Sequence, residues 1–186
     1  MNAEIASYQD VLDFWFDEKN KSHWFSKDPN FDAEIAKRFL KTHHRAAQSA
    51  CFEWRKTAKG RLAEIIVLDQ FPRNMFRNSA KAFASDPLAL ALAQDAVERG
   101  IDKELATTER SFLYMPYMHS EALRVHDEAI KLFSQPGLEH NLEYEVLHKK
   151  VIERFGRYPH RNKALGREST PDEVAYLAAD SSSKKW

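Results

Sequence analysis

Glycine is scarce in this chain, where it occurs only five times in 186 residues. Glycine is the residue that most readily enters the left-handed conformation of tight turns. A chain with only a few glycines therefore favours long helices over a hairpin-rich sheet. Apolar residues recur at helical spacing, as in Phe31, Ile35 and Phe39, which places them on one helix face. No stretch alternates strongly enough to require a strand. The sequence therefore predicts an all-α fold.

Start and stop signals divide the chain into a compact array of about six to eight antiparallel helices. Ser7 followed by Asp10 predicts the start of the first helix. Asp28 with Pro29 predicts the start of a second helix, which runs toward Phe52.

The middle of the chain is punctuated by proline and glycine. A third helix is predicted over about residues 61–70, because Pro72 interrupts the chain just after it. A fourth helix is predicted to have Asp86 as its N-cap, Pro87 as its first residue and Gly100 at its end.

The last third of the chain predicts three further helices. A long one is expected over about residues 108–133, bent by Pro116. The next ends at Gly156, and Thr170 with Glu173 forms a capping-box start for a short final helix.

The length of the chain suits one domain that can bury its own core without disulfides or metal. No low-complexity linker divides it. We expect residues 1–186 to form a single all-helical domain, with a disordered tail at residues 181–186.

Charge and cysteine content exclude several functional classes. The chain carries 28 Lys plus Arg and 28 Asp plus Glu, so it lacks the basic surplus of a nucleic-acid-binding protein. The only cysteine, Cys51, rules out an intrachain disulfide and a thiolate metal cage. No apolar run approaches the roughly 20 residues that a membrane helix needs. We expect a cytoplasmic protein with no nucleic-acid or membrane partner.

Four blocks of sequence resemble an uncharacterised bacterial family, the domain of unknown function numbered nine-two-four. The blocks lie at residues 14–39, 68–86, 112–121 and 148–171, and the last contains the unusual run Tyr158-Pro159-His160-Arg161-Asn162. The resemblance implies an all-helical array similar to tetratricopeptide-like proteins. It brings no established activity, substrate or cofactor.

Asp69 is out of place among its neighbours, because it shares the predicted inner helix face with Leu62, Ile65 and Ile66. A buried carboxylate without a partner costs several kcal/mol or becomes protonated. Asp69 is therefore either one half of a structural ion pair or a functional acid or base. The candidate partners are Arg73, Arg110, Arg157 and Arg161.

Three histidines, His119, His126 and His148, lie on otherwise apolar helix faces. A histidine there is either a hydrogen-bonded core residue or a ligand or general base. No His-x-x-x-His signature is present. We therefore expect no metal and no cofactor.

Arginines gather in two similar loops that each follow a helix, at residues 71–77 and 157–167. Guanidinium groups suit carboxylate and phosphate ligands, so the two loops would form an anion pocket if they converge. Alternatively, these arginines cap helix ends and pair with the chain's own carboxylates. The residues expected at such a pocket are Arg73, Asn74, Arg77, Glu121, His148, Arg157, His160, Arg161, Asn162 and Arg167.

Three hypotheses of function follow. The leading one is a protein that binds a small anion or an acidic peptide in this pocket. The second is an enzyme that uses Asp69 or His119 as a general acid–base on a phosphorylated or carboxylated metabolite. The third is an interaction scaffold in which the polar cluster is purely structural. The sequence does not indicate an oligomeric state.

Overall fold

The computed structural model describes residues 5–179, so the tail predicted to be disordered lies outside the described residues. Within this part the regular structure is entirely helical, which confirms the predicted all-α fold. The α-helices are α1 (Tyr8–Trp15), α2 (Glu18–Lys21), α3 (Pro29–Ala47), α4 (Ala58–Asp69), α5 (Phe71–Met75), α6 (Asp86–Glu98), α7 (Thr107–Met118), α8 (Leu123–Phe133), α9 (Glu139–Phe155) and α10 (Pro171–Ala179). Four short 3₁₀ turns join them: η1 (Phe52–Lys56), η2 (Ala80–Ala82), η3 (Ile101–Glu104) and η4 (Pro159–Arg161).

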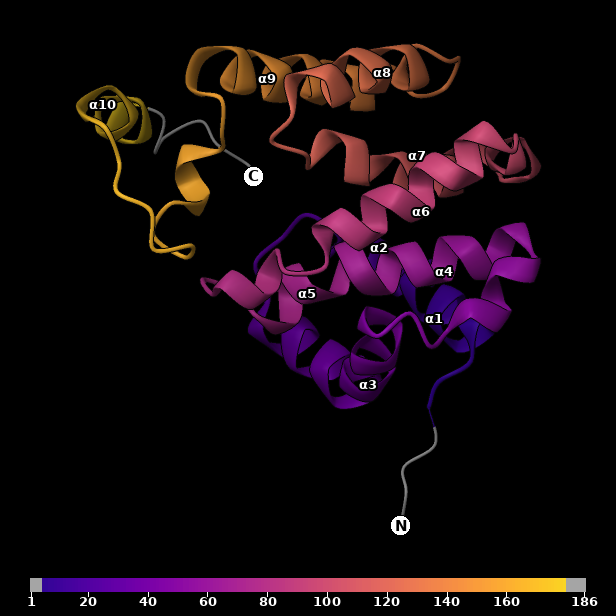
Figure 1. The fold of residues 1–186 in the computed structure, drawn as a ribbon. Coiled ribbons are helices and arrows are strands. Elements are labelled where there is room, and N and C mark those ends of the chain that lie inside the picture. The colour runs from indigo at the N-terminus through magenta and orange to yellow at the C-terminus, as the bar shows by residue number, and fades with distance from the viewer. Residues whose placement is uncertain (1–4, 180–186) are drawn as a thin grey trace.

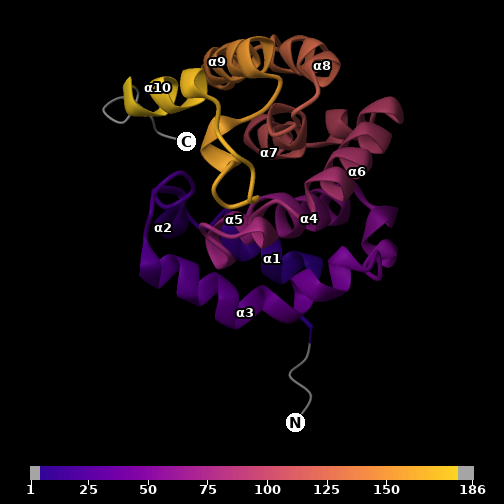
Figure 2. The ribbon, with the colours of Figure 1, turned by 60° about the vertical axis from the view of Figure 1, so that its left-hand side comes forward.

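The helices stack in layers. Figure 1 shows α8 and α9 side by side at one end, α7 and α6 below them, then α4, and α1 and α3 at the opposite end. The segment between α9 and α10 descends from the α8–α9 layer toward α5 (Figures 1 and 2). The segment between α9 and α10 therefore lies beside residues that come much earlier in the chain, on one side of the molecule.

Helix α4 occupies the centre of the array. It packs against α1, α3, α6 and α7. A helix that has neighbours all round must be apolar all round, and Leu62, Ile65, Val67 and Leu68 are all inaccessible to solvent. Asp69, the last residue of α4, is equally buried. The predicted 61–70 helix therefore exists, with three extra residues at its start.

Most of the predicted helix ends are present. Ser7 and Asp10 form a capping box, and Thr170 and Glu173 exchange the two hydrogen bonds of another. Gly156 ends α9 with φ +67°, a conformation that glycine adopts without strain. At α6 the prediction was wrong by one residue, because Ser85 is the N-cap and Asp86 is already helical.

The predicted long helix over residues 108–133 is wrong. The chain forms two helices, α7 and α8, separated by a turn at residues 119–122. At this turn the amide of Ala122 donates to Ser120 Oγ (3.1 Å) instead of continuing the α-helical pattern. We call residues 118–122 the α7–α8 turn.

The C-terminal segment has its own small core. Val151, Ile152 and Tyr158 pack with Phe155 and Tyr176, apart from the main core that α1 and α3–α8 share. The contacts between this segment and the α7–α8 turn are polar, and they build the site described next. No helix in the described part of the chain is long and apolar enough to cross a membrane.

Candidate functional site

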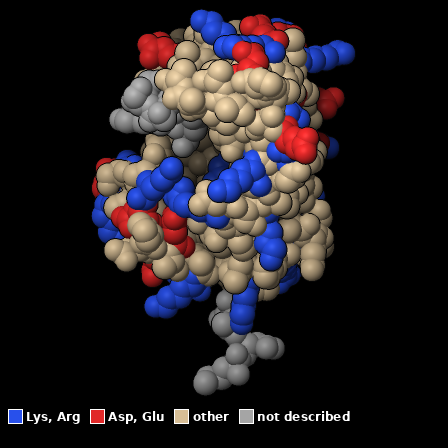
Figure 3. Space-filling model, turned by 90° about the vertical axis from the view of Figure 1, so that its left-hand side faces the viewer, with Lys and Arg blue, Asp and Glu red and all other residues tan. Residues whose placement is uncertain are grey.

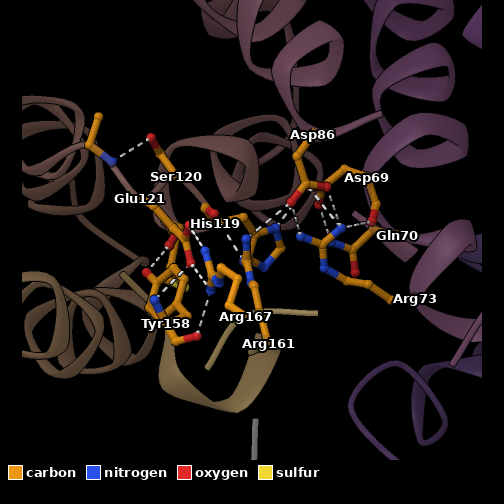
Figure 4. A network of polar contacts seen from close by, with 12 residues as sticks. Asp69, Gln70, Arg73, Asp86, His119, Ser120, Glu121, Tyr158, Arg161 and Arg167 are labelled. Carbon is orange, nitrogen blue, oxygen red and sulfur yellow. Dashed lines mark hydrogen bonds and ion pairs between the residues drawn. The ribbon is translucent and has the colours of Figure 1, made fainter. Parts of the chain in front are cut away.

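A network of polar side chains lies where five parts of the chain meet (Figure 4). Asp69 ends α4, Arg73 lies in α5, Asp86 begins α6, and His119 lies in the α7–α8 turn. Arg161 reaches them from η4. The helix break after α4, which Pro72 marks in the sequence, lets the α5 residue Arg73 turn back toward Asp69.

Asp69 and His119 form a hydrogen-bonded pair. His119 Nδ1 lies 2.8 Å from Asp69 Oδ1, and Gln70 Nε2 donates to the other carboxylate oxygen at 2.6 Å. A carboxylate only accepts, so His119 carries its proton on Nδ1 and has its Nε2 lone pair available when neutral. The Asp69 side chain is fully buried, whereas that of His119 is 15% exposed.

The surroundings favour an ionised Asp69 beside a neutral His119. Burial alone would raise the pKa of Asp69, but the nearby Arg73 and His119 hold this pKa well below its ordinary value. Burial and Arg73 together lower the pKa of His119, although Asp69 opposes them. The imidazole is therefore poised as a base near neutral pH.

Asp86 joins the two arginine loops. Arg73 donates to both of its oxygens at 3.0 and 2.9 Å, and Arg161 Nη1 lies 3.4 Å from one of them. The Arg161 guanidinium also lies over the rings of Phe83 (4.7 Å) and Tyr158 (4.5 Å). Arg161 is buried, and its Nε has no hydrogen-bond partner in the described structure. Arg73 and Arg161, one from each arginine-bearing segment, therefore meet at the Asp86 carboxylate.

A second ion pair flanks this centre. Arg167 donates to both oxygens of Glu121 at 2.7 and 2.9 Å, and its Nε donates to Asn162 Oδ1 at 2.9 Å. Glu121 also accepts the Tyr158 amide at 2.7 Å. These contacts lower the pKa of Glu121 against the opposing effect of burial.

Two of the arginines point elsewhere. Arg77 and Asn74 both bind Asp32 of α3. Arg157 forms a two-pronged pair with Glu173 of α10 at 2.7 and 2.8 Å, and the hydrogen bond from Arg157 lowers the pKa of Glu173 to about 2. The arginines therefore do not all converge on one pocket, because the carboxylates that hold them lie on different helices.

The other predicted histidines, His148 and His160, lie beside the ring of Tyr158. His148 Nδ1 lies 2.8 Å from the Tyr144 carbonyl within α9, and burial lowers its pKa to about 3. His160 is exposed, with its ring 5.4 Å from that of Tyr158. Among the candidate histidines His119, His148 and His160, His119 contacts Asp69 directly. No group of three or more His, Cys, Asp or Glu residues in the described structure could hold a metal ion.

Several residues of the site were not singled out from the sequence. Gln70 and Tyr158 were missed because they are neutral and stand next to charged residues or proline in the sequence. Both lie in the blocks that carry the family resemblance, which is the signal that could have found them. His126 was noted only as a residue on an apolar face. It forms a fully buried pair with Glu145 of α9, at 2.7 Å. No spacing rule predicts that pair, since it joins two helices.

The surface beside the site is hollowed. Figure 3 shows a hollow between the upper and lower parts of the molecule, with Lys and Arg side chains along its margin and Asp and Glu side chains nearby. This side carries α5 and the segment between α9 and α10, which hold Arg73 and Arg161 (Figure 1).

A family model described as a bacterial protein of unknown function (DUF924) matches residues 11–181. The chain belongs to this DUF924 family. This member of the family has the all-helical fold described above. It is similar to a solved structure of a protein of unknown function, ATU0120 from Agrobacterium tumefaciens. The TM-score is 0.87 at 39% sequence identity, over 92% of this chain and 97% of the other. No curated protein matches.

Proposed function

We propose that this DUF924 protein is an enzyme in which His119 is the general acid–base and Asp69 orients it. The substrate class that fits is a small carboxylated or phosphorylated metabolite. The single observation that carries this proposal is the 2.8 Å contact from His119 Nδ1 to a fully buried carboxylate, while the His119 side chain is 15% exposed. Such a carboxylate fixes both the tautomer and the direction of the imidazole.

The lowered pKa of His119 supports the same role. A lowered pKa keeps the imidazole neutral, which is the form that can accept a proton, and the Asp69 contact fixes its position. Among the described residues, no hydrogen bond occupies His119 Nε2. That nitrogen is therefore the atom that would take a proton from the substrate and return it.

The neighbouring guanidinium groups suit a substrate that bears negative charge. Arg73 and Arg161 lie on the same carboxylate, Asp86, and both are close enough to Asp69 and His119 to share one network (Figure 4). Arginine stabilises charge that develops on carboxylate or phosphate oxygens.

The test is turnover of a panel of carboxylic esters, phosphate monoesters and hydroxy acids by the wild-type protein and His119→Gln. We expect His119→Gln to lower the rate by about 10²–10⁴-fold, the usual contribution of a general acid–base. His140→Gln is the matched control, because His140 is exposed and pairs only weakly with Glu143 (3.6 Å). Equal turnover by His119→Gln and the wild type would refute the proposal, and a panel without turnover would count against this substrate class.

A second candidate is binding of a small anion or acidic peptide without chemistry. The observation that favours it is the buried Nε of Arg161, which has no partner. Thermal shifts with inorganic phosphate and with dicarboxylates test it, since an anion at 100 times its Kd stabilises the fold by about 2.7 kcal/mol. Arg161→Met should abolish the shift, whereas Arg154→Met, at an exposed ion pair, should keep it. If neither ligand class shifts the melting temperature, the polar network is structural and the scaffold hypothesis gains.

Four broader expectations complete the proposal. The layered helix pairs support a tetratricopeptide-like arrangement in a single domain. The zero net charge supports the absence of a nucleic-acid partner, and the lone buried Cys51 supports a cytoplasmic location.

A further inference from the structure

The α7–α8 turn, which presents His119, has three successive backbone carbonyls that no helix satisfies. Each accepts a hydrogen bond from a side chain elsewhere in the fold. Tyr158 donates its hydroxyl to the Met118 carbonyl at 2.6 Å, and Arg161 Nη2 donates to the His119 carbonyl at 2.9 Å. His126 Nε2 lies 2.8 Å from the Ser120 carbonyl.

These three donors are themselves held rigidly. Tyr158 and His126 are fully buried, and Arg161 is nearly so. Glu145 fixes His126 through the opposite ring nitrogen at 2.7 Å, and the Arg161 guanidinium lies over the rings of Phe83 and Tyr158. Because buried donors in fixed positions define where a carbonyl can lie, they define the course of the turn.

We propose that Tyr158, Arg161 and His126 are positioning residues for His119, so that the segment between α9 and α10 completes the site. The inference rests on the proposed function of His119. It adds that the C-terminal segment is a functional part of the site and not only a packing element. Two of the three donors come from that segment, and its contacts with the turn are hydrogen bonds and ion pairs.

Arginine is required at position 161 for geometric reasons. Its planar group reaches the His119 carbonyl with one nitrogen and Asp86 with another while lying over two aromatic rings. A lysine keeps the positive charge, but its three donors radiate from one nitrogen and do not reproduce the planar fork that spans both partners. Arg161→Lys therefore changes the position of the turn and not the charge of the site.

The test measures His119 in the free protein, without a substrate. Imidazole ¹⁵N–¹H correlation spectra follow the tautomer and the pKa of each of the eight histidines, and His119→Gln assigns the His119 signals. Tyr158→Phe and Arg161→Lys are compared with Arg154→Lys, an arginine whose exposed pair with Asp172 lies away from the turn. Melting temperatures are recorded for all variants.

We expect the pKa of His119 to rise toward 6.5 in Tyr158→Phe and Arg161→Lys, with a weaker preference for the Nδ1–H tautomer, because a loosened turn exposes the ring. Arg154→Lys should match the wild type. If Arg161→Lys does not fold, Tyr158→Phe decides, since it removes one oxygen atom only. Unchanged His119 signals in a folded Tyr158→Phe protein would overturn the inference and leave the proposed function standing. Altered signals combined with full turnover by His119→Gln would instead refute the proposed function alone.

Discussion

The Asp69–His119 pair makes a quantitative prediction about folding stability. In His119→Phe the ring stays but the donor to Asp69 is lost, and in Asp69→Asn the carboxylate is lost at nearly constant volume. Both side chains lie in the interior of the network, and Asp69 is fully buried. Each change therefore leaves a polar partner unsatisfied.

The structure sets the size of each effect. Asp69 accepts from His119 and Gln70 and lies 3.4 Å from Arg73 Nη1. Removing one partner of a buried ion pair costs about 3–5 kcal/mol. Because Arg73 keeps both of its hydrogen bonds to Asp86, we expect Asp69→Asn to cost about 3 kcal/mol, at the lower end of that range. His119→Phe should cost about 1–3 kcal/mol, the penalty of an unmade bond to a buried acceptor.

The assay is urea unfolding at pH 7.5 of the wild type, both single variants and the double variant. The acceptor of this hydrogen bond, Asp69, is charged, and such bonds contribute about 1.5–3 kcal/mol. The double variant should therefore be more stable, by about that amount, than the sum of the two single losses predicts. Asp69→Asn combined with His140→Phe is the control. It should be additive within about 0.5 kcal/mol, because His140 is exposed and distant in the fold.

Additive losses in the Asp69–His119 cycle would refute the reasoning. Such a result would mean that the two side chains do not interact in solution, and the orientation of His119 by Asp69 would then have no basis.

Three further predictions concern other parts of the fold. Burial lowers the pKa of His43 to about 4, so the folded state takes up this proton less readily than the unfolded chain. The contribution of His43 to the free energy of unfolding should therefore be fully present above about pH 6.5 and fall as the pH drops toward 4, with about 2 kcal/mol lost at pH 5. In a series of urea titrations at different pH values, His43→Leu should show a smaller loss of stability over this range. Gly156→Ala should lower the free energy of unfolding by about 1 kcal/mol in the same titration, since φ is +67° at this position. No atom lies within 4 Å of the added Cβ, so the loss would come from the backbone conformation and not from a clash, and a loss near zero would contradict this argument. Arg157→Met should release α10 without affecting α1–α8, because the hydrogen bonds of Arg157 in the described part of the chain go to Glu173 and to the Glu168 carbonyl. Faster hydrogen exchange confined to residues 157–179 is the expected result, and faster exchange in α4 would contradict it.

Local chemistry determined the helices and most of their ends. The capping boxes at Ser7 and Thr170 and the left-handed glycine at Gly156 act within a few residues of themselves, so they can be read from the sequence. The placement of Asp69 on a buried face followed from helical periodicity in the same way.

The tertiary structure decided the α7–α8 turn and the pairing of the arginines. Residues 108–133 have a continuous helical period, yet side chains from α8 and from the segment between α9 and α10 take the carbonyls of residues 118–120. Likewise, the sequence could not show that Arg77 and Arg157 point away from the site of Arg73 and Arg161. The carboxylates that bind Arg77 and Arg157 lie on α3 and α10. The physical reason is the same in both cases. Hydrogen bonds between distant segments depend on where the folded chain brings the partners, and no local period carries that information.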